Sequence, residues 1–168
     1  MPNVRDGRSS RRGFSFVVAA SLAASVLGGS PAFAADTALP VPTSLPKAGT
    51  LAVGKGEPLV LLVSLPGCPY CEMVRRSYLL PLRVEGLPAW QINTTDSASP
   101  LEGFNGQRTS GAEFTREMRI RITPTVLFLD AGGHELAPRL EGFTSLDFYG
   151  AYLNDALASA RQALKARY

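Results

Sequence analysis

The chain has 168 residues, 45% of them hydrophobic, which suffices for one globular domain with a substantial core. Its formal net charge of +3 comes from the first 34 residues, where Arg5, Arg8, Arg11 and Arg12 accompany one acid, Asp6, and the remainder is formally neutral. The charge therefore gives no support for a nucleic-acid partner, and we expect none.

The first 34 residues have the parts of a secretory signal peptide. A basic start precedes an apolar stretch, residues 14–27, which is shorter than the ~20 residues of a membrane-spanning helix. Ala32-Phe33-Ala34 fits a small-residue cleavage site. We predict that residues 1–34 are a cleaved signal peptide; an uncleaved anchor or a disordered tail is the alternative.

Ser10-Arg11-Arg12-Gly13-Phe14 resembles the twin-arginine export signal, although the general secretory route stays open. Both routes predict a protein that is released into the periplasm after cleavage, and disulfide chemistry is permitted in that compartment.

Residues 35–56 are rich in proline and glycine, which favours a linker. We expect at most a short helix or edge strand near residues 50–53, followed by one domain over residues 57–168.

A continuous apolar run at residues 58–65 predicts a buried strand. It ends at Pro66-Gly67, and a helix is expected from Cys68 to about Leu80. Pro81 should end or kink this helix, because its ring removes an N–H donor and clashes with the preceding turn.

Two cysteines, Cys68 and Cys71, begin that helix. Cysteines three apart at a helix start lie close enough for their sulfurs to bond. Cys68 would sit at the exposed N-terminus, where unpaired N–H groups and the helix dipole favour a thiolate. This predicts Cys68 as the nucleophile of thiol–disulfide exchange and Cys71, more shielded, as the resolving thiol.

Apolar spacing and turn residues organise the remainder of the chain. In order we expect a strand at 87–93, a long loop at 94–110, a helix at 111–119, a strand at 120–130, a hairpin turn at 131–133, its partner strand at 135–143 and an amphipathic helix from Ser145.

This order of elements resembles the thioredoxin fold from about Pro58 to Tyr168. The resemblance rests on Cys68-Pro69-Tyr70-Cys71 after a hydrophobic strand, Thr123-Pro124-Thr125 before a later strand, and Gly142 after the hairpin. It implies an α/β, thioredoxin-like fold with a central mixed β-sheet flanked by helices.

The resemblance also assigns roles to individual residues. It implies that Pro124 is cis and lies beside the cysteines, and that Thr123 offers backbone groups to an extended substrate segment. Pro69 and Tyr70, between the cysteines, are expected to tune the site, although Tyr70 could equally cover the helix start.

Three departures separate the chain from thioredoxins proper. Pro69-Tyr70 replaces Gly-Pro and looks like the pair in glutaredoxins and some periplasmic isomerases. Gly67 stands where thioredoxins have Trp, and Leu62 matches their buried Asp. We therefore expect a thioredoxin-like relative without the thioredoxin reductase partnership.

Other readings of these residues are weaker. A structural disulfide closing so short a loop would remove little unfolded-chain entropy. A closed zinc site needs four ligands, and the sequence has two cysteines and one histidine, His134, which we interpret as an exposed turn residue. Trp90 is assigned to the core, and Arg75 and Arg76 to a solvated helix face.

The leading hypothesis is a monomeric periplasmic thiol–disulfide oxidoreductase that reduces partner disulfides through Cys68 and Cys71, without metal or other cofactor. Its partners would be proteins with disulfides or thiols and, for a reductant, a membrane electron donor. The alternatives are a disulfide-forming oxidant of the same fold and a non-catalytic Cu(I)- or thiol-binding module.

Overall fold

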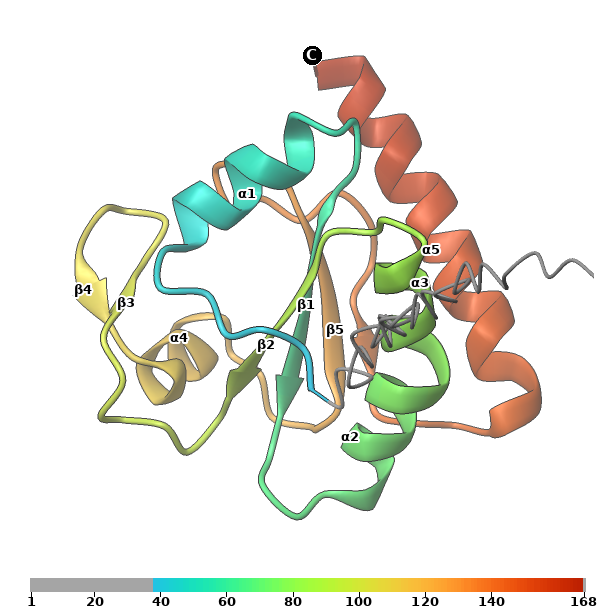
Figure 1. Cartoon of the computed structure of the whole chain (residues 1–168), viewed down its shortest axis with the longest axis horizontal. Helices are drawn as coiled ribbons and strands as arrows, with labels where there is room; N and C mark the ends of the chain where they lie inside the picture. The colour runs from blue at the N-terminus through green and yellow to red at the C-terminus, as the bar shows by residue number, and fades with distance from the viewer. Residues whose placement is uncertain (1–37, 168) are drawn as a thin grey trace, which may run out of the picture. The chain divides into compact units, whose positions relative to one another are not determined.

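The computed structural model describes residues 38–167 (Figure 1). In chain order the elements are α1 (Leu45–Val53), β1 (Leu59–Ser64), α2 (Pro69–Val74), a π-helical segment η1 (Arg75–Leu79), α3 (Leu80–Val84), β2 (Ala89–Asn93), β3 (Leu101–Glu102), β4 (Arg108–Thr109), α4 (Gly111–Glu117), β5 (Thr125–Leu129), β6 (Leu140–Glu141) and α5 (Leu146–Arg167).

Four strands form a mixed sheet in the order β2-β1-β5-β6. β1 is parallel to β2 and antiparallel to β5, and β5 is antiparallel to β6. Val63, near the end of β1, pairs with Thr125, the first residue of β5. The register therefore brings the segment after β1 and the segment before β5 to the same end of the sheet, where β1 finishes and β5 starts.

The sheet has an apolar core on each face, because neighbouring residues of a strand point to opposite sides. On one face Leu59, Leu61 and Val63 of β1 pack with residues of α1 and α4. On the other, Val60 and Leu62 pack with the helical run after β1 and with α5. Helices on both faces of a mixed sheet confirm the predicted α/β, thioredoxin-like fold (Figure 1).

The linker expected over residues 35–56 is wrong for its second half, which forms α1. Ser44 caps this helix by accepting a hydrogen bond from the Lys47 N–H, at 3.3 Å. The buried residues Leu45, Ala48 and Ala52 place one helical face in the core. Because prolines and glycines favour a linker, the sequence pattern did not predict this helix, although proline is well tolerated in a first helical turn.

The helix after the cysteines is longer than expected and continues past Pro81. α2, η1 and α3 run without a break from residue 69 to residue 84. The Leu80 N–H bonds to the Arg75 carbonyl, five residues back, so the turn before Pro81 is wide. A π-type turn next to proline relieves the missing N–H donor and the clash with the preceding turn.

The later elements follow the predicted order with shorter strands. The expected loop at 94–110 contains the small hairpin of β3 and β4. The strand expected at 120–130 is limited to β5, and that expected at 135–143 pairs as β6 and as one isolated bridge between Leu129 and Glu135.

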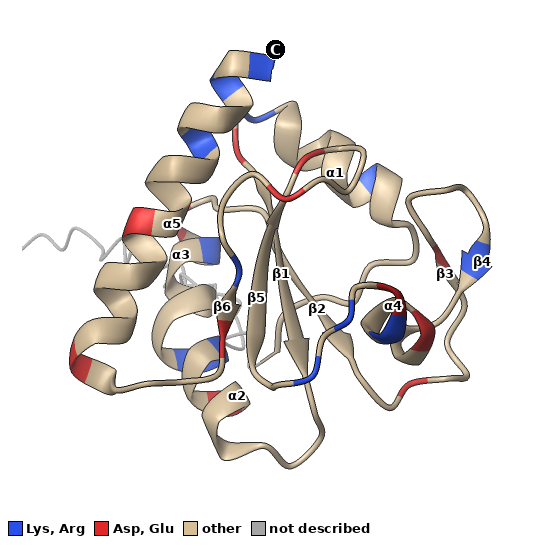
Figure 2. Ribbon diagram, turned by 180° about the vertical axis from the view of Figure 1, so that it is seen from behind, with Lys and Arg blue, Asp and Glu red and all other residues tan. Residues whose placement is uncertain are grey.

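The predicted C-terminal helix is α5. An acid, Asp147, lies in its first turn, and Lys165 and Arg167 lie in its last, which suits the helix dipole (Figure 2). Within residues 38–167 no helix has the length and apolarity needed to cross a membrane. The predicted signal peptide lies outside the described residues.

Candidate active site

A tight turn delivers the first cysteine from β1 to α2. The Cys68 N–H donates to the Leu65 carbonyl at 3.2 Å, and Gly67 has a φ of 73°. Proline followed by a residue with positive φ is the signature of a type II turn, in which glycine is favoured. This explains why the position that is Trp in thioredoxins is Gly67 here.

Cys68 is the N-cap of α2, and its Sγ accepts a hydrogen bond from the Cys71 N–H at 3.2 Å. The two sulfurs are joined in a disulfide, with Cα atoms 5.2 Å apart. Cys68 is half-buried, whereas Cys71 is only 1% exposed. An attacking partner can thus approach Cys68 more readily than Cys71.

The Thr123-Pro124 peptide bond is cis, and it precedes β5 at the sheet edge where β1 ends. Pro124 is buried and Thr123 half-buried. The Pro124 carbonyl accepts a hydrogen bond from the Gly142 N–H at 2.7 Å. The two motifs, far apart in the chain, therefore follow β1 and precede β5 at the same end of the sheet, and the loop after β6 supports the second.

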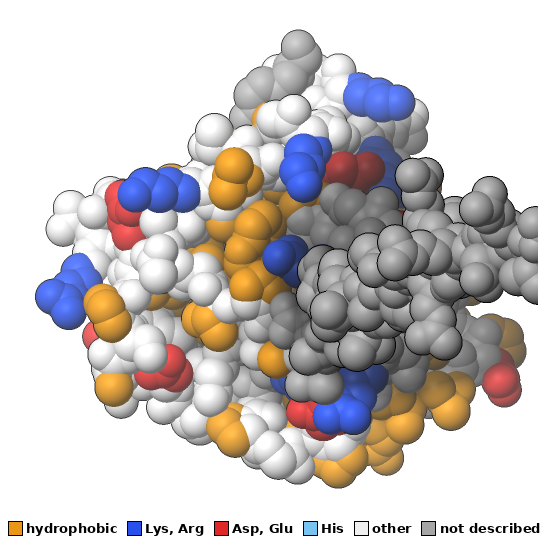
Figure 3. Space-filling view, in the orientation of Figure 1, with side chains coloured by type: hydrophobic (Ala, Val, Ile, Leu, Met, Phe, Trp, Pro, Cys, Tyr) orange, Lys and Arg blue, Asp and Glu red, His pale blue; other side chains and the backbone are white. Residues whose placement is uncertain are grey.

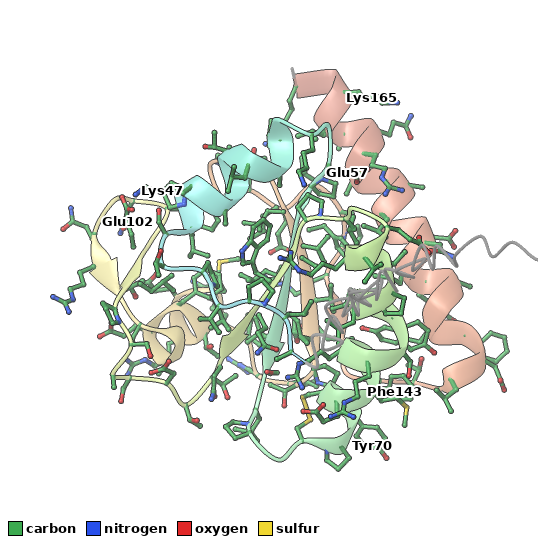
Figure 4. All side chains as sticks on the ribbon, in the orientation of Figure 1. Lys47, Glu57, Tyr70, Glu102, Phe143 and Lys165 are labelled. Carbon is green, nitrogen blue, oxygen red and sulfur yellow. A yellow bond between two sulfur atoms is a disulfide. The ribbon has the colours of Figure 1, made fainter. Side chains whose placement is uncertain are left out.

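An aromatic stack links the helix start to that same loop. The ring of Tyr70 stacks on Phe143 with centroids 5.7 Å apart, and Phe143 packs on Tyr149 of α5 at 5.2 Å (Figure 4). Tyr70 nevertheless stays 56% exposed. Its ring is thus held in place by Phe143 while one side remains open to solvent.

Exposed apolar side chains accompany the disulfide. Leu65 precedes the turn, Tyr70 lies between the cysteines and Ile122 precedes the cis peptide bond, and all three are exposed. Hydrophobic side chains gather at the lower edge of the space-filling view, where α2 begins in Figure 1 (Figure 3). This surface suits a polypeptide better than a small polar ligand.

Two hollows among residues 38–167 lie away from the cysteine motif. One of about 530 Å³ is formed by residues around β3 and β4, including Leu101 and Arg108. Another, of about 280 Å³, lies between Leu51 of α1 and Trp90 of β2. Neither hollow is lined by a cysteine.

A family model described as a thioredoxin-like domain matches residues 45–157. The chain belongs to this thioredoxin-like family. The match begins at α1, in keeping with the packing of that helix into the core. A search of curated proteins finds no match.

Solved structures similar to this thioredoxin-like protein include the reduced periplasmic thioredoxin SoxS of Paracoccus pantotrophus (23% identity, TM-score 0.40, 60% of this chain and 96% of that one). A thioredoxin-fold protein of Helicobacter pylori is 18% identical (TM-score 0.39, coverage 67% and 84%). Oxidised thioredoxin O2 of Arabidopsis thaliana is 13% identical (TM-score 0.43, coverage 71% and 96%).

The family and the cysteine pair together establish the class of reaction. This thioredoxin-like protein is a thiol–disulfide oxidoreductase, and proteins of its kind act on thiols and disulfides of other proteins.

The assignment of Arg75 to a solvated helix face is wrong. The residue is 7% exposed and lies beneath the helix. Its Nε donates to Gln91 Oε1 of β2 at 2.6 Å, Nη2 to Ser64 Oγ of β1 at 3.3 Å, and Nη1 to Glu72. Helical periodicity contained a usable signal, because Arg75 lies one turn after the buried Cys71 on the same face.

Glu72 and Arg76 complete this polar cluster at the surface. Arg76 is exposed and donates to Glu72 Oε2 at 3.2 Å. The hydrogen bond from Arg75, together with the charges of both arginines, holds the pKa of the Glu72 carboxyl below its usual value of 4.5, although desolvation opposes this. The cluster therefore carries two positive charges and one negative charge on the helix directly after Cys71.

His134 and Trp90, the other residues considered in the sequence, have structural roles. His134 is exposed in the turn after β5, as predicted, and its ring contacts Asp130. Trp90 is partly buried against the core, with the Arg83 guanidinium 5.8 Å from its ring centroid. Residues 38–167 contain no group of three or more His, Cys, Asp or Glu side chains placed to hold a metal ion.

Proposed function

We propose that this protein is an exported, periplasmic reductant of protein disulfides that works through Cys68 and Cys71. The observation that carries the proposal is the unequal exposure of the two sulfur-bearing residues at the start of α2, at the sheet edge that also holds the cis peptide bond before Pro124. A half-buried cysteine at a helix N-terminus suits attack, and a buried one suits resolution.

In the reducing direction the Cys68 thiolate attacks one sulfur of a partner disulfide. A mixed disulfide forms, the partner's S–S bond breaks, and the released partner thiolate takes a proton from solvent. Cys71, as a thiolate, then attacks Cys68 Sγ, which forms the internal disulfide and releases the second partner thiolate, also to be protonated. Two electrons pass to the partner, and no metal or nucleotide takes part.

The residues around Cys68 would form the binding surface for the partner protein. We propose that Thr123 offers its backbone to an extended partner segment, since it is half-buried directly before the cis bond. Tyr70, held by Phe143, would contact apolar residues flanking the partner's disulfide. Pro69 would restrict the helix start, because proline suits the first helical position.

Substitution of each cysteine tests these roles. Cys68→Ser should reduce insulin disulfides no faster than buffer, because the attacking sulfur is gone. Cys71→Ser should instead accumulate a covalent mixed disulfide with its substrate, because the resolving sulfur is gone. The measurements are insulin turbidity and non-reducing gel electrophoresis with mass spectrometry.

Wild-type protein and the Cys68→Ser/Cys71→Ser double variant are the controls for rate and for trapping. Insulin reduction by Cys68→Ser at the wild-type rate would contradict the proposal. A copper-binding module predicts instead that the reduced protein binds Cu(I) tightly and is inert toward insulin.

A further inference from the structure

The thioredoxin-like site of this chain lacks one group that its relatives place under the cysteines. The position matching their buried Asp is Leu62, which is fully buried in β1. The charged side chain beneath the helix is instead a cation, Arg75, which approaches from the helix itself.

Arg75 is fixed one helical turn after Cys71 by its backbone and by its side chain. Its N–H bonds to the Cys71 carbonyl, one turn back. Residues four apart on a helix have Cβ atoms about 5–6 Å apart, and helical side chains lean toward the N-terminus. Two of its side-chain partners flank the cysteine motif in the sequence. Ser64 lies before it, at the end of β1, and Glu72 directly follows Cys71.

Burial makes this cation effective. The Arg75 side chain is 9% exposed, whereas that of its neighbour Arg76 is 64% exposed and that of Glu72 is 50% exposed. Solvent screens the charge of an exposed side chain much more than that of a buried one. Among these three residues, Arg75 therefore carries the charge that solvent screens least.

We infer that Arg75 is a positioning residue whose buried positive charge stabilises the reduced, thiolate form of the Cys68–Cys71 pair and so sets its reduction potential. The inference rests on the proposed function, because it concerns the same pair of sulfurs. The equilibrium at issue is internal disulfide plus two glutathione thiols giving the Cys68 and Cys71 thiols plus glutathione disulfide. A cation near a thiolate moves it toward the reduced protein.

The test is the equilibrium constant with glutathione at about pH 8, close to the thiol reference pKa of about 8.5. Arg75→Met should move the equilibrium about tenfold toward the disulfide, which is about 30 mV toward a more negative potential. Glu72→Gln removes the negative charge of the cluster and should move the equilibrium several-fold in the opposite direction. Ultraviolet absorbance of the thiolate should show the Cys68 pKa rising in Arg75→Met and falling in Glu72→Gln.

Two variants separate charge from structure. Arg76→Met removes an exposed arginine that contacts the same Glu72, and it should stay within about twofold of wild type because its charge is screened. Arg75→Lys keeps the charge but loses the forked hydrogen bonds, so it should lower the melting temperature and leave the equilibrium constant within about threefold of wild type.

A wild-type equilibrium constant in Arg75→Met, or an equal shift in Arg75→Lys and Arg75→Met, would overturn the inference. If Arg75→Met does not fold, Arg75→Gln, which removes the charge and keeps a hydrogen-bonding group, replaces it, and a wild-type equilibrium constant in that variant overturns the inference. Failure of the proposed function is distinguishable, because it would appear as the absence of reversible thiol–disulfide exchange in the wild-type protein itself.

Discussion

Two buried charged side chains, Arg75 and Asp130, each bind several partners and join segments that are distant in the sequence. Arg75 joins the active-site helix to β1 and β2. Asp130, at the end of β5, is 3% exposed. It accepts hydrogen bonds from the N–H groups of Gly132 and His134, both at 2.9 Å, and from the Arg167 guanidinium of α5. Such residues stabilise the fold only while they are charged and fully partnered.

Asp130→Asn should lower the free energy of unfolding at neutral pH by about 1–3 kcal/mol, because the amide lacks the charge that Arg167 and the turn N–H groups bind. Burial alone would raise the pKa of Asp130, but the N–H groups of His134 and Gly132 and the contact with the His134 ring outweigh it, so the pKa lies below 3.8. The stabilisation by the ionised Asp130 carboxylate is therefore complete above its unfolded-state pKa of 3.8. It is lost as the pH falls through the lower pKa of the folded state.

Urea unfolding as a function of pH measures this contribution. The difference in free energy of unfolding between wild type and Asp130→Asn should be constant from pH 7 to about pH 5 and shrink below about pH 4. Asp155→Asn, on the exposed side of α5, is the matched control. If the difference in free energy of unfolding between wild type and Asp130→Asn stayed the same in acid, the effect of the substitution would be steric and not ionic.

Elements in this protein are positioned by close backbone approaches as well as by apolar faces. Helix α1 covers one face of the sheet and crosses the turn after β5, where its Gly49 faces Ala131. A Cβ built on Gly49 would lie 2.8 Å from the Ala131 Cα and 3.2 Å from the Asp130 carbonyl oxygen. Both are backbone atoms, which cannot rotate away as a side chain could. The glycine is thus required by packing within a helix.

Gly49→Val should destabilise the protein by about 1–3 kcal/mol, the usual range for an overpacked site, although valine is a better helix former than glycine. Leu51→Val on the exposed face of the same helix is the control and should stay within about 0.5 kcal/mol of wild type. Chemical denaturation of both variants gives the comparison. A Gly49→Val protein as stable as wild type would mean that α1 is not seated on this turn.

At the scale of the whole molecule, overall charge does not decide the direction of electron flow. Basic and acidic residues are interspersed along the ribbon (Figure 2), and the sequence after residue 34 is formally neutral, so the net charge gives no support for selection of a charged partner. The direction of exchange therefore depends on the reduction potential of the disulfide relative to its surroundings. In the periplasm a reductant also needs electrons from a membrane donor, because that compartment is kept oxidising.

Redox titration of the purified wild-type protein against dithiothreitol or glutathione buffers measures that potential. We expect a value near the thioredoxin value of about −270 mV, which suits a reductant supplied from the membrane. A value near −120 mV would contradict the reducing direction and identify an oxidant of folding proteins. Protein purified from periplasmic extract should also begin near Ala35, as its intact mass would show.

Local patterns in the sequence determined most of the fold and the location of the site. A continuous apolar run, a cysteine pair at a helix start and a Thr-Pro before a later strand depend on short-range chemistry, namely burial of a strand, capping of a helix and the restricted backbone of proline. These features are visible in a few adjacent residues. They were enough to predict the order of elements around the site, and the resemblance of that order and its motifs to the thioredoxin fold implied the architecture.

Tertiary structure alone decided which polar and small residues are buried. Helical spacing places Arg75, but not the adjacent and chemically identical Arg76, on the face of buried Cys71, and the hydrogen bonds to Ser64 and Gln91 under the helix allow its charged group to stay buried there. The same holds for α1, whose prolines and glycines are typical of a linker until the sheet supplies the surface that its Leu45, Ala48 and Ala52 cover. Burial depends on partners distant in the chain, and no local pattern records where those partners lie.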